Sequence, residues 1–311
     1  MIRRPPRSTL DRSSAASDVY KRQVAEFNRA TKGVYEMGST FKLFTSAMAL
    51  DTGRVRLADR FDARKPIKIS RFTISDYHAK NKWLTVPEVI VHSSNIGAAK
   101  IALEVGTSTQ KRYLKRLGLL SPARIELIEV GAPLSPVLWR EINTMTISFG
   151  HGIAVSPLQL SLGVGALVNG GVLLDATLLK LGKEPKLGGI RVIKSQTSQV
   201  MRDLMRLVVR QGSGRRAEVP GYFVGGKTGT ANKPGKRQKG YRTRKLISSF
   251  VAAFPTDTPR YVVLALLDEP KGIKETQGFS TAGWVAAPIV PVSYTHLRAH
   301  ETEADLVCRL L

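Results

Sequence analysis

The amino-acid sequence predicts an α+β fold, because helix patterns fill its middle and strand patterns follow late in the chain. Apolar residues recur at helical spacing over four segments, which are residues 39–50, 86–104, 156–169 and 196–211. After them come short apolar or β-branched runs separated by turn residues, which are residues 222–224, 227–231, 247–254 and 261–267. Consecutive strands with short connections favour antiparallel pairing, so we expect one antiparallel sheet flanked by helices.

The helical segments carry recognisable start and stop signals. Gly38 permits a sharp entry into the first helix, and the second segment is expected to break into two helices at residues 93–95. Ser156 is a typical N-cap with Pro157 at the first helical position of the third segment. A last helix is expected to begin over residues 280–290.

The chain is expected to contain one domain between two foreign ends. Its 311 residues suffice for one large domain or two small ones, and 42% hydrophobic with 23% charged residues is ordinary for a globular protein. Residues 1–23 and 292–311 resemble translated sequencing-adapter sequence, so we interpret both as non-native tails and place the domain at residues 24–291. The single cysteine, Cys308, lies in the second tail, so the domain cannot form a disulfide or a cysteine-ligated metal site.

The chain is strongly basic, with 48 Lys and Arg against 24 Asp and Glu and a formal net charge of +24. Such a charge favours polyanions or anionic surfaces as partners. Nucleic acid is the usual partner of a basic protein, but no nucleic-acid motif is recognisable and the basic residues are scattered along the chain. Anionic cell-wall polymer or a membrane surface fits the charge equally well, and we expect no nucleic acid partner.

The first candidate motif for chemistry is Ser39-Thr-Phe-Lys42, at the start of the first helix. Residues three apart share a helix face, so the Ser39 hydroxyl and the Lys42 amine are expected within hydrogen-bonding reach. Lys42 can activate Ser39 only as a neutral amine, which requires a pKa lowered by burial or by a second lysine. A helix N-terminus also favours a developing oxyanion, so we interpret Ser39 as a nucleophile and Lys42 as its base.

This spacing of serine and lysine is weak evidence when it stands alone. About one such match per chain of this size arises by chance. Ser108 and Lys111 form a second match, which we interpret as the solvated start of a helix, with Ser108 as its cap and Lys111 exposed. The interpretation of the first match therefore depends on the other motifs.

The second motif, Ser93-Ser94-Asn95, lies in the expected break between two helices. The Ser93 hydroxyl could relay a proton between Lys42 and a leaving group, and the Asn95 amide could hold a substrate carbonyl or Lys42. Taken alone, the pattern favours the simpler role of capping the following helix.

The third motif, Lys227-Thr228-Gly229-Thr230, predicts a strand at a sheet edge, against which an extended peptide can lie. Gly229 lacks a side chain, so another backbone or a ligand can approach closely. Lys227 and the two threonines can bind a terminal carboxylate, and the Thr230 N–H can join that of Ser39 in an oxyanion hole. An exposed lysine at a glycine-rich strand end is the alternative, but this string is expected by chance in fewer than about one chain in a hundred.

The three motifs occur in the order that characterises serine β-lactamases and penicillin-binding proteins. Together with the surrounding segments GVYEMGSTFK, LTVPEVIVHSSNIGAAK, SFGHGIAVSPLQL and GYFVGGKTGTA, they make the chain resemble class B penicillin-binding proteins. The resemblance is specifically to the cell-division peptidoglycan D,D-transpeptidases of the alphaproteobacterial type, and it covers about residues 24–290.

The resemblance implies the penicillin-recognising serine-transferase fold, with a five-stranded antiparallel sheet, flanking helices and a helical subdomain. It also implies that Ser39 attacks the D-Ala-D-Ala amide of a peptidoglycan stem peptide and then passes the acyl group to an amine on a neighbouring stem. β-Lactams would acylate the same serine, and neither a metal nor an organic cofactor would be needed. The implied catalytic residues are Ser39, Lys42, Ser93, Asn95 and Lys227, and the implied substrate-binding residues are Thr228, Gly229 and Thr230.

The resemblance further implies a place in the cell. Family members normally carry an N-terminal membrane anchor and a pedestal domain, whereas residues 24–291 begin just before the active-site helix. We therefore expect the full-length protein at the periplasmic face of the bacterial inner membrane, among divisome proteins, and this chain to lack the anchor. For His151, which lies in a loop element of the family, we expect a structural role, and His78 and His92 show no zinc-ligand spacing with acidic residues.

Four alternative functions remain open at this point. An elongation-specific class B transpeptidase would carry out the same chemistry. A serine β-lactamase would need a group that activates the deacylating water, and no convincing element of that kind is recognisable. A penicillin-binding sensor or scaffold without turnover would share the motifs, and a nucleic-acid binder would bind DNA in a salt-dependent manner.

Overall fold

The computed structural model describes residues 27–69, 72–180, 188–234 and 241–293, and it confirms the α+β class. The segment 1–23, residues 294–311 of the second expected tail and Cys308 lie outside the described residues. The helical elements are η1 (Gly38–Thr40), α2 (Phe41–Asp51), α3 (Val86–Val91), α4 (Asn95–Val105), α5 (Thr107–Arg116), α6 (Glu141–Ile147), α7 (Pro157–Val168), α8 (Ser195–Gln211), η2 (Arg215–Ala217), η3 (Lys274–Thr276) and α9 (Ala282–Val285). The strands are β1 (Arg60–Asp62), β2 (Ile67–Ile69), β3 (Phe72–Ile74), β4 (Trp83–Thr85), β5 (Val172–Leu174), β6 (Gly189–Arg191), β7 (Gly225–Pro234), β8 (Tyr241–Phe254) and β9 (Tyr261–Asp268).

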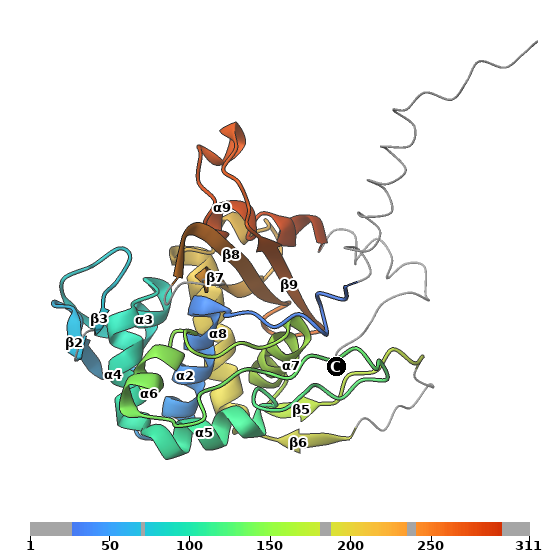
Figure 1. Ribbon diagram of the computed structural model, residues 1–311, viewed down its shortest axis with the longest axis horizontal. Helices are drawn as coiled ribbons and strands as arrows, with labels where there is room; N and C mark the ends of the chain where they lie inside the picture. The colour runs from blue at the N-terminus through green and yellow to red at the C-terminus, as the bar shows by residue number, and fades with distance from the viewer. Residues whose placement is uncertain (1–26, 70–71, 181–187, 235–240, 294–311) are drawn as a thin grey trace, which may run out of the picture.

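The three long strands form one antiparallel sheet in the order β7-β8-β9. On the central strand, Phe250, Ala252 and Phe254 pack in a cluster with α9, whereas Val251 and Ala253 belong to the main helical core. This alternation follows from the two-residue period of a strand and buries both faces of the sheet. Figure 1 shows the resulting layers, with α9 on one side of the sheet and α2, α7 and α8 on the other.

The number of strands differs from the expectation. Where the family resemblance implied five strands, the main sheet has three among the described residues, and the shorter strands pair with one another in two-stranded sheets. The expected strand at residues 222–224 is wrong, because the Val224 N–H donates to the Tyr222 carbonyl oxygen at 3.1 Å and closes a turn. Gly221, with a φ of +81°, lies in the turn just before it, which the Tyr222 N–H closes by donating to the Val219 carbonyl oxygen at 3.0 Å. The apolar Val224 therefore enters the core from a loop.

The last helix begins in the expected range, at Ala282, but it is interrupted. The helix α9 ends at Val285, residues 286–288 form a turn, and helical backbone resumes over residues 289–293. Pro288 explains the interruption, because a proline disfavours helical backbone at the residue before it and has no N–H to donate.

The other helices agree with the sequence. The 86–104 segment divides into α3 and α4 at the expected place, and Ser156 caps α7 by accepting a hydrogen bond from the Gln159 N–H at 3.2 Å. Ser108 and Lys111 are exposed on α5, as expected. Ser108 is not the cap, however, because the chain turns at Gly106 (φ +80°) and the helix begins directly after it.

The chain between α2 and α3 forms two small antiparallel sheets, in which β1 pairs with β4 and β2 pairs with β3. Figure 1 shows the β2–β3 pair projecting beside α3 and α4. None of the helices within the described ranges has the length and apolarity that crossing a lipid bilayer requires. The small sheets matter for the site, because the segment that follows β3 returns to the start of α4.

Candidate active site

Ser39 and Lys42 lie together at the start of α2, as their spacing predicts. Ser39 occupies the turn η1 and is half-buried, whereas Lys42 is fully buried in the first turn of α2. Lys42 Nζ is 2.8 Å from Ser39 Oγ. Residues 41–49 are all buried, so α2 shields the lysine amine from bulk water.

The break between α3 and α4 brings the second motif onto Lys42. Lys42 Nζ lies 2.6 Å from the Ser93 carbonyl oxygen, 3.1 Å from Ser93 Oγ and 2.8 Å from Asn95 Oδ1. Ser93 has a φ of +57°, which is rare for a residue with a side chain. A neutral amine has two N–H donors and one lone pair, so donation to the Ser93 carbonyl and to Asn95 leaves the lone pair for the Ser39 hydroxyl.

Lys227 approaches Ser93 from the sheet. This lysine is fully buried on β7, and its Nζ donates to Ser93 Oγ at 2.9 Å and to the Thr228 carbonyl oxygen at 3.1 Å. Burial lowers the pKa of Lys227 to about 7. Ser93 Oγ thus bridges two buried amines, and a hydroxyl in this position can accept a proton from one side while it donates to the other.

The surroundings of Lys42 favour its neutral form. Burial lowers the pKa of Lys42 well below its ordinary value, and repulsion from Lys227 lowers it further, while Asp76 opposes the shift. Activation of Ser39 needs burial or a second lysine to lower the pKa of Lys42, and both are present, with Lys227 as the second lysine. Lys42 can therefore take up the proton of the Ser39 hydroxyl near neutral pH.

The turn that carries Ser39 approaches the edge of β7 closely, mainly backbone against backbone. A Cβ atom on Gly229 would lie 2.4 Å from the Met37 carbonyl oxygen, and one on Gly38 would lie 2.8 Å from the Thr230 carbonyl oxygen. Gly38 also has a φ of +56°, which a side chain would strain. The close approach sets Ser39 beside Thr230, as an oxyanion hole formed by their two N–H groups requires.

The two threonines of the third motif have different surroundings. Thr228 is buried, and its hydroxyl shares a hydrogen bond with the hydroxyl of Ser213, just after α8. Thr230 Oγ1 accepts a hydrogen bond from the Ala282 N–H at 3.1 Å, at the start of α9. These contacts attach the edge strand to two helices and fix the direction of both side chains.

Two residues of the site were not found by sequence reasoning. Asp76 binds the start of α4 from a loop, and Ser213 contacts Thr228. Each lies at least 15 positions from its partner, and neither belongs to a short motif. The only available signal was composition: Asp76 is a lone acid in the otherwise basic 64–82 segment.

His151 lies near the site in a loop between two left-handed glycines. A Cβ atom on Gly150 would lie 2.2 Å from the Gly38 carbonyl oxygen, so the loop supports the turn that carries Ser39. The imidazole packs edge-on against Phe149, with ring centroids 5.3 Å apart. Burial, and secondarily the charge of Lys42, lowers the pKa of His151 to about 4, so the ring is neutral at pH 7. A neutral, packed imidazole agrees with the structural role expected for this residue.

Metal ligands do not gather in the part of the chain that the structure describes. No group of three or more His, Cys, Asp or Glu side chains there could hold a metal ion. The polar atoms around Ser39 are instead two lysine amines, hydroxyls, one amide and one carboxylate. This set is suited to proton transfer around a serine nucleophile.

The fold and the site together have the arrangement that a lysine-assisted serine acyl-transferase requires, with a buried amine 2.8 Å from a serine hydroxyl. The chain belongs to the penicillin-binding protein transpeptidase domain family, whose pattern it matches over residues 10–290. The probable peptidoglycan D,D-transpeptidase FtsI of Caulobacter vibrioides is 48% identical over 268 residues, which cover 84% of this chain and 46% of that protein. The stage V sporulation protein D of Bacillus subtilis is 32% identical over 304 residues, which cover 93% of this chain and 45% of that protein.

Solved structures agree with this membership. The TP domain of penicillin-binding protein 3 from Burkholderia pseudomallei superposes with a TM-score of 0.78 at 35% identity, covering 88% of this chain and 81% of that one. Penicillin-binding protein 3 of Mycobacterium tuberculosis complexed with ampicillin gives a TM-score of 0.80 at 25% identity, covering 91% and 68%. The resemblance stated from the motifs is therefore confirmed, and the chain spans about half the length of the curated relatives it matches.

Proposed function

We propose that this domain is the catalytic unit of a serine D,D-transpeptidase that cross-links peptidoglycan stem peptides. The observation that carries the proposal is the continuous line of contacts from Ser39 through Lys42 and Ser93 to Lys227, in which no step exceeds 3.1 Å. Family membership and the name of the Caulobacter relative support this reaction class.

In the proposed acylation step, Ser39 Oγ bonds to the carbonyl carbon of the D-Ala-D-Ala amide while Lys42 takes the hydroxyl proton. The N–H groups of Ser39 and Thr230 stabilise the oxyanion. Lys42 then returns the proton through the Ser93 hydroxyl to the amide nitrogen, the C–N bond breaks, and D-alanine leaves as an amine. The stem peptide remains as an ester on Ser39.

In the transfer step, an amine of a neighbouring stem peptide attacks the ester carbonyl. A new C–N bond forms, the bond to Ser39 Oγ breaks, and the surplus proton of the amine passes through Lys42 back to Ser39. Every group in this scheme belongs to the chain or to the two peptides, so no metal or organic cofactor takes part. A β-lactam presents a strained cyclic amide and would acylate Ser39 by the same first step.

The donor peptide would lie along β7. This strand is at one edge of the described sheet, with β8 on its other side, so an extended peptide can add to it as a further strand. The terminal carboxylate would bind Lys227 and the Thr228 and Thr230 hydroxyls, with Gly229 leaving room for close approach. A carboxylate beside Lys227 would raise the pKa of that lysine and so favour its charged form.

We also propose the cellular setting and the limits of the domain. The name FtsI of the Caulobacter relative supports a role in septal cell-wall synthesis, with divisome proteins as partners. Such a protein acts at the periplasmic face of the bacterial inner membrane. The domain would span residues 24–291, and the segments 1–23 and 292–311 would be non-native. The family match begins at residue 10 and so runs into the first of these segments.

The decisive experiment is to map the adduct of a labelled penicillin by peptide mass spectrometry, with Ser39→Ala in parallel. We expect one slowly released penicilloyl adduct on Ser39 in the purified chain and none in the variant. Rapid release would indicate a β-lactamase. A stable adduct would favour a sensor if the protein cannot transfer the acyl group of a D-Ala-D-Ala donor to an amine. If the protein melts cooperatively but forms no adduct, the assignment of Ser39 is overturned.

A further inference from the structure

The Ser93-Ser94-Asn95 motif is held by Asp76, a carboxylate that belongs to none of the three motifs. Asp76 lies in the loop after β3, 18 positions before Ser94. Its Oδ2 accepts a hydrogen bond from the Ser94 hydroxyl at 2.7 Å, and its Oδ1 accepts from the N–H groups of Asn95 and Ile96 at 2.6 Å and 3.0 Å. One side chain thus satisfies three donors at the start of α4, where backbone N–H groups have no helical partner.

The residue before Asp76 completes the attachment. The Ser75 carbonyl oxygen accepts a hydrogen bond from Asn95 Nδ2 at 2.9 Å. Because the Asn95 amide nitrogen points to Ser75, the amide oxygen points away from Ser75, and this oxygen lies 2.8 Å from Lys42 Nζ. Ser75 and Asp76 therefore fix the backbone and the side chain of Asn95, and through it the amine of Lys42.

We propose that Asp76 is a positioning residue of the acylation machinery, which holds residues 93–95 against Lys42 and brings a negative charge close to this lysine. The inference rests on the proposed function of the site. Asp76 would not touch the substrate, and it would act only through Asn95, Ser93 and Lys42.

The charged groups around Lys42 come from several elements. Lys227 on β7 lowers the pKa of Lys42, and Asp76 raises it. His151, in the loop after α6, has a pKa lowered to about 4 and is neutral at pH 7, so it does not offset Asp76. Removing the Asp76 charge would therefore lower the pKa of Lys42, and removing its hydrogen bonds would release Asn95.

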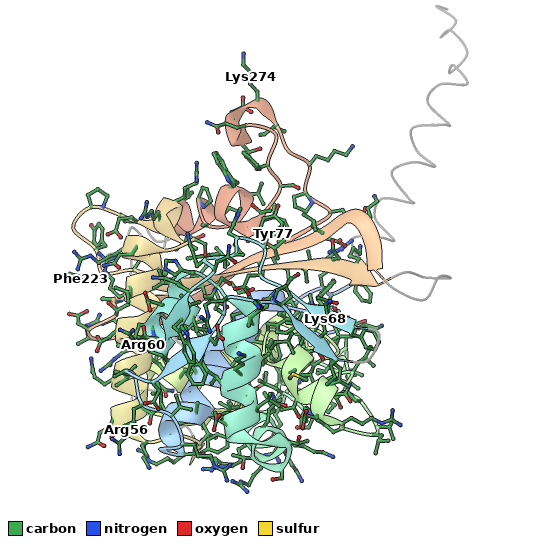
Figure 2. The ribbon with its side chains drawn as sticks, turned by 90° about the vertical axis from the view of Figure 1, so that its left-hand side faces the viewer. Arg56, Arg60, Lys68, Tyr77, Phe223 and Lys274 are labelled. Atoms are coloured by element: carbon green, nitrogen blue, oxygen red, sulfur yellow. The ribbon has the colours of Figure 1, made fainter. Side chains whose placement is uncertain are left out.

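Asp76 can be replaced without opening the core. Its side chain is half-buried, and the next residue, Tyr77, is 82% exposed. Figure 2 shows Tyr77 projecting at the surface, above Lys68 of the same chain segment. A substitution at Asp76 thus tests its polar contacts rather than the packing of the domain.

The experiment compares Asp76→Asn, which keeps the shape and removes the charge, with Asp76→Ala, which removes both. The measurement is the second-order rate of acylation by a fluorescent penicillin from pH 5 to pH 9, together with the melting temperature. For Asp76→Asn we expect the acid limb of the profile to move down by about one pH unit, because neutral Lys42 persists to lower pH. For Asp76→Ala we expect acylation to slow by about 10- to 100-fold at every pH, because Lys42 is no longer oriented.

The matched control is Asp51→Asn, which alters another carboxylate that accepts hydrogen bonds at a helix start, at the far end of α2. It should lower the melting temperature and leave the pH profile unchanged. Asp76 variants that behave in the same way would overturn the proposal, since Asp76 would then be a structural cap alone.

A second readout does not depend on acylation. The ¹³Cε resonance of Lys42, assigned by its loss in Lys42→Met, should titrate at lower pH in Asp76→Asn than in the wild type. An unchanged titration would contradict the proposal. Because this signal needs no penicillin, it tests Asp76 even if the wild-type protein forms no adduct on Ser39, an outcome that would instead overturn the proposed function.

Discussion

The two ends of α2 are both buried and polar, yet their electrostatics are opposite. At the C-terminal end, Asp51 accepts hydrogen bonds from the Tyr113 hydroxyl at 2.7 Å, from the Lys194 N–H at 2.7 Å and from the Thr197 hydroxyl at 2.9 Å. At the N-terminal end, about 14 Å away along the helix, Lys42 meets uncharged oxygens and lies near a second buried lysine.

The difference shows how one helix combines stability with reactivity. The Asp51 carboxylate is matched by donors from α5 and from the start of α8, and these contacts join three helices. Burial, and secondarily the hydrogen bond to Asp51, raise the pKa of Tyr113 to about 12, so the phenol stays a donor. Lys42 is surrounded by four oxygen atoms, but a neutral amine has only two N–H groups to donate to them. Its lone pair therefore stays reactive, and the site is less stable than one in which every acceptor has a donor.

The largest expected effect comes from removing the reactive amine. Lys42→Met should reduce the rate of penicillin acylation by at least about 1,000-fold, because Ser39 loses its base. The melting temperature should hold or rise, since methionine fills a similar volume without a buried amine. Stopped-flow kinetics measure the acylation rate, and a thermal melt measures the melting temperature. A variant that is acylated at the wild-type rate would contradict the role of Lys42.

A smaller effect should appear in the pH dependence of stability. The pKa of Lys227 is lowered to about 7 in the folded protein, so the unfolded chain binds more protons between pH 7 and the ordinary lysine pKa. Wild-type stability should therefore rise with pH across that window. Below pH 7 Lys227 is charged in the folded protein too, so the full cost of burying a charged amine lowers the stability there. Lys227→Met should have a larger unfolding free energy than the wild type at pH 6. This difference should become smaller by about 3 kcal/mol when the pH is raised to 10.

Chemical denaturation at several pH values measures this difference. Lys68→Met, at an exposed lysine, is the control and should show no comparable trend. If the unfolding free energies of Lys227→Met and the wild type depend equally on pH, the pKa of Lys227 is not lowered in the folded protein.

The smallest effect concerns the stable end of the helix. Asp51→Asn should lower the unfolding free energy by about 2 kcal/mol, because one oxygen acceptor becomes an N–H₂ group facing donors. Acylation of Ser39 should keep its wild-type rate while the protein is folded. A slower acylation in fully folded Asp51→Asn would show that the two ends of α2 are coupled, and the comparison would then fail.

Much of the site could be predicted from the sequence because its chemistry sits in short motifs. Ser39, Lys42, Ser93, Asn95 and Lys227 were each assigned in advance, and the structure brings them into one hydrogen-bonded group. Some helix boundaries were also predictable, since a cap such as Ser156 acts over a few residues, whereas Ser108 was wrongly expected to cap α5.

What could not be predicted depends on contacts between distant segments. Asp76 reaches α4 only because the β2–β3 pair returns the chain to that point, and no local pattern specifies this path. The 222–224 run was apolar enough for a strand, but Gly221 turns it into a loop that still buries Val224. Apolar runs of three residues do not distinguish these outcomes.

The backbone contacts among Gly38, Gly150 and Gly229 limit how this protein can change by mutation. Each position faces a carbonyl oxygen at a distance that excludes even a methyl group, so any substitution there would move Ser39 away from its partners. On the proposed function, a variant selected under antibiotic exposure has to keep all three glycines. Substitutions that change the reaction with β-lactams and keep the fold would have to fall on the residues around them, such as Ser213 or Asp76, where a side chain already exists and can be exchanged.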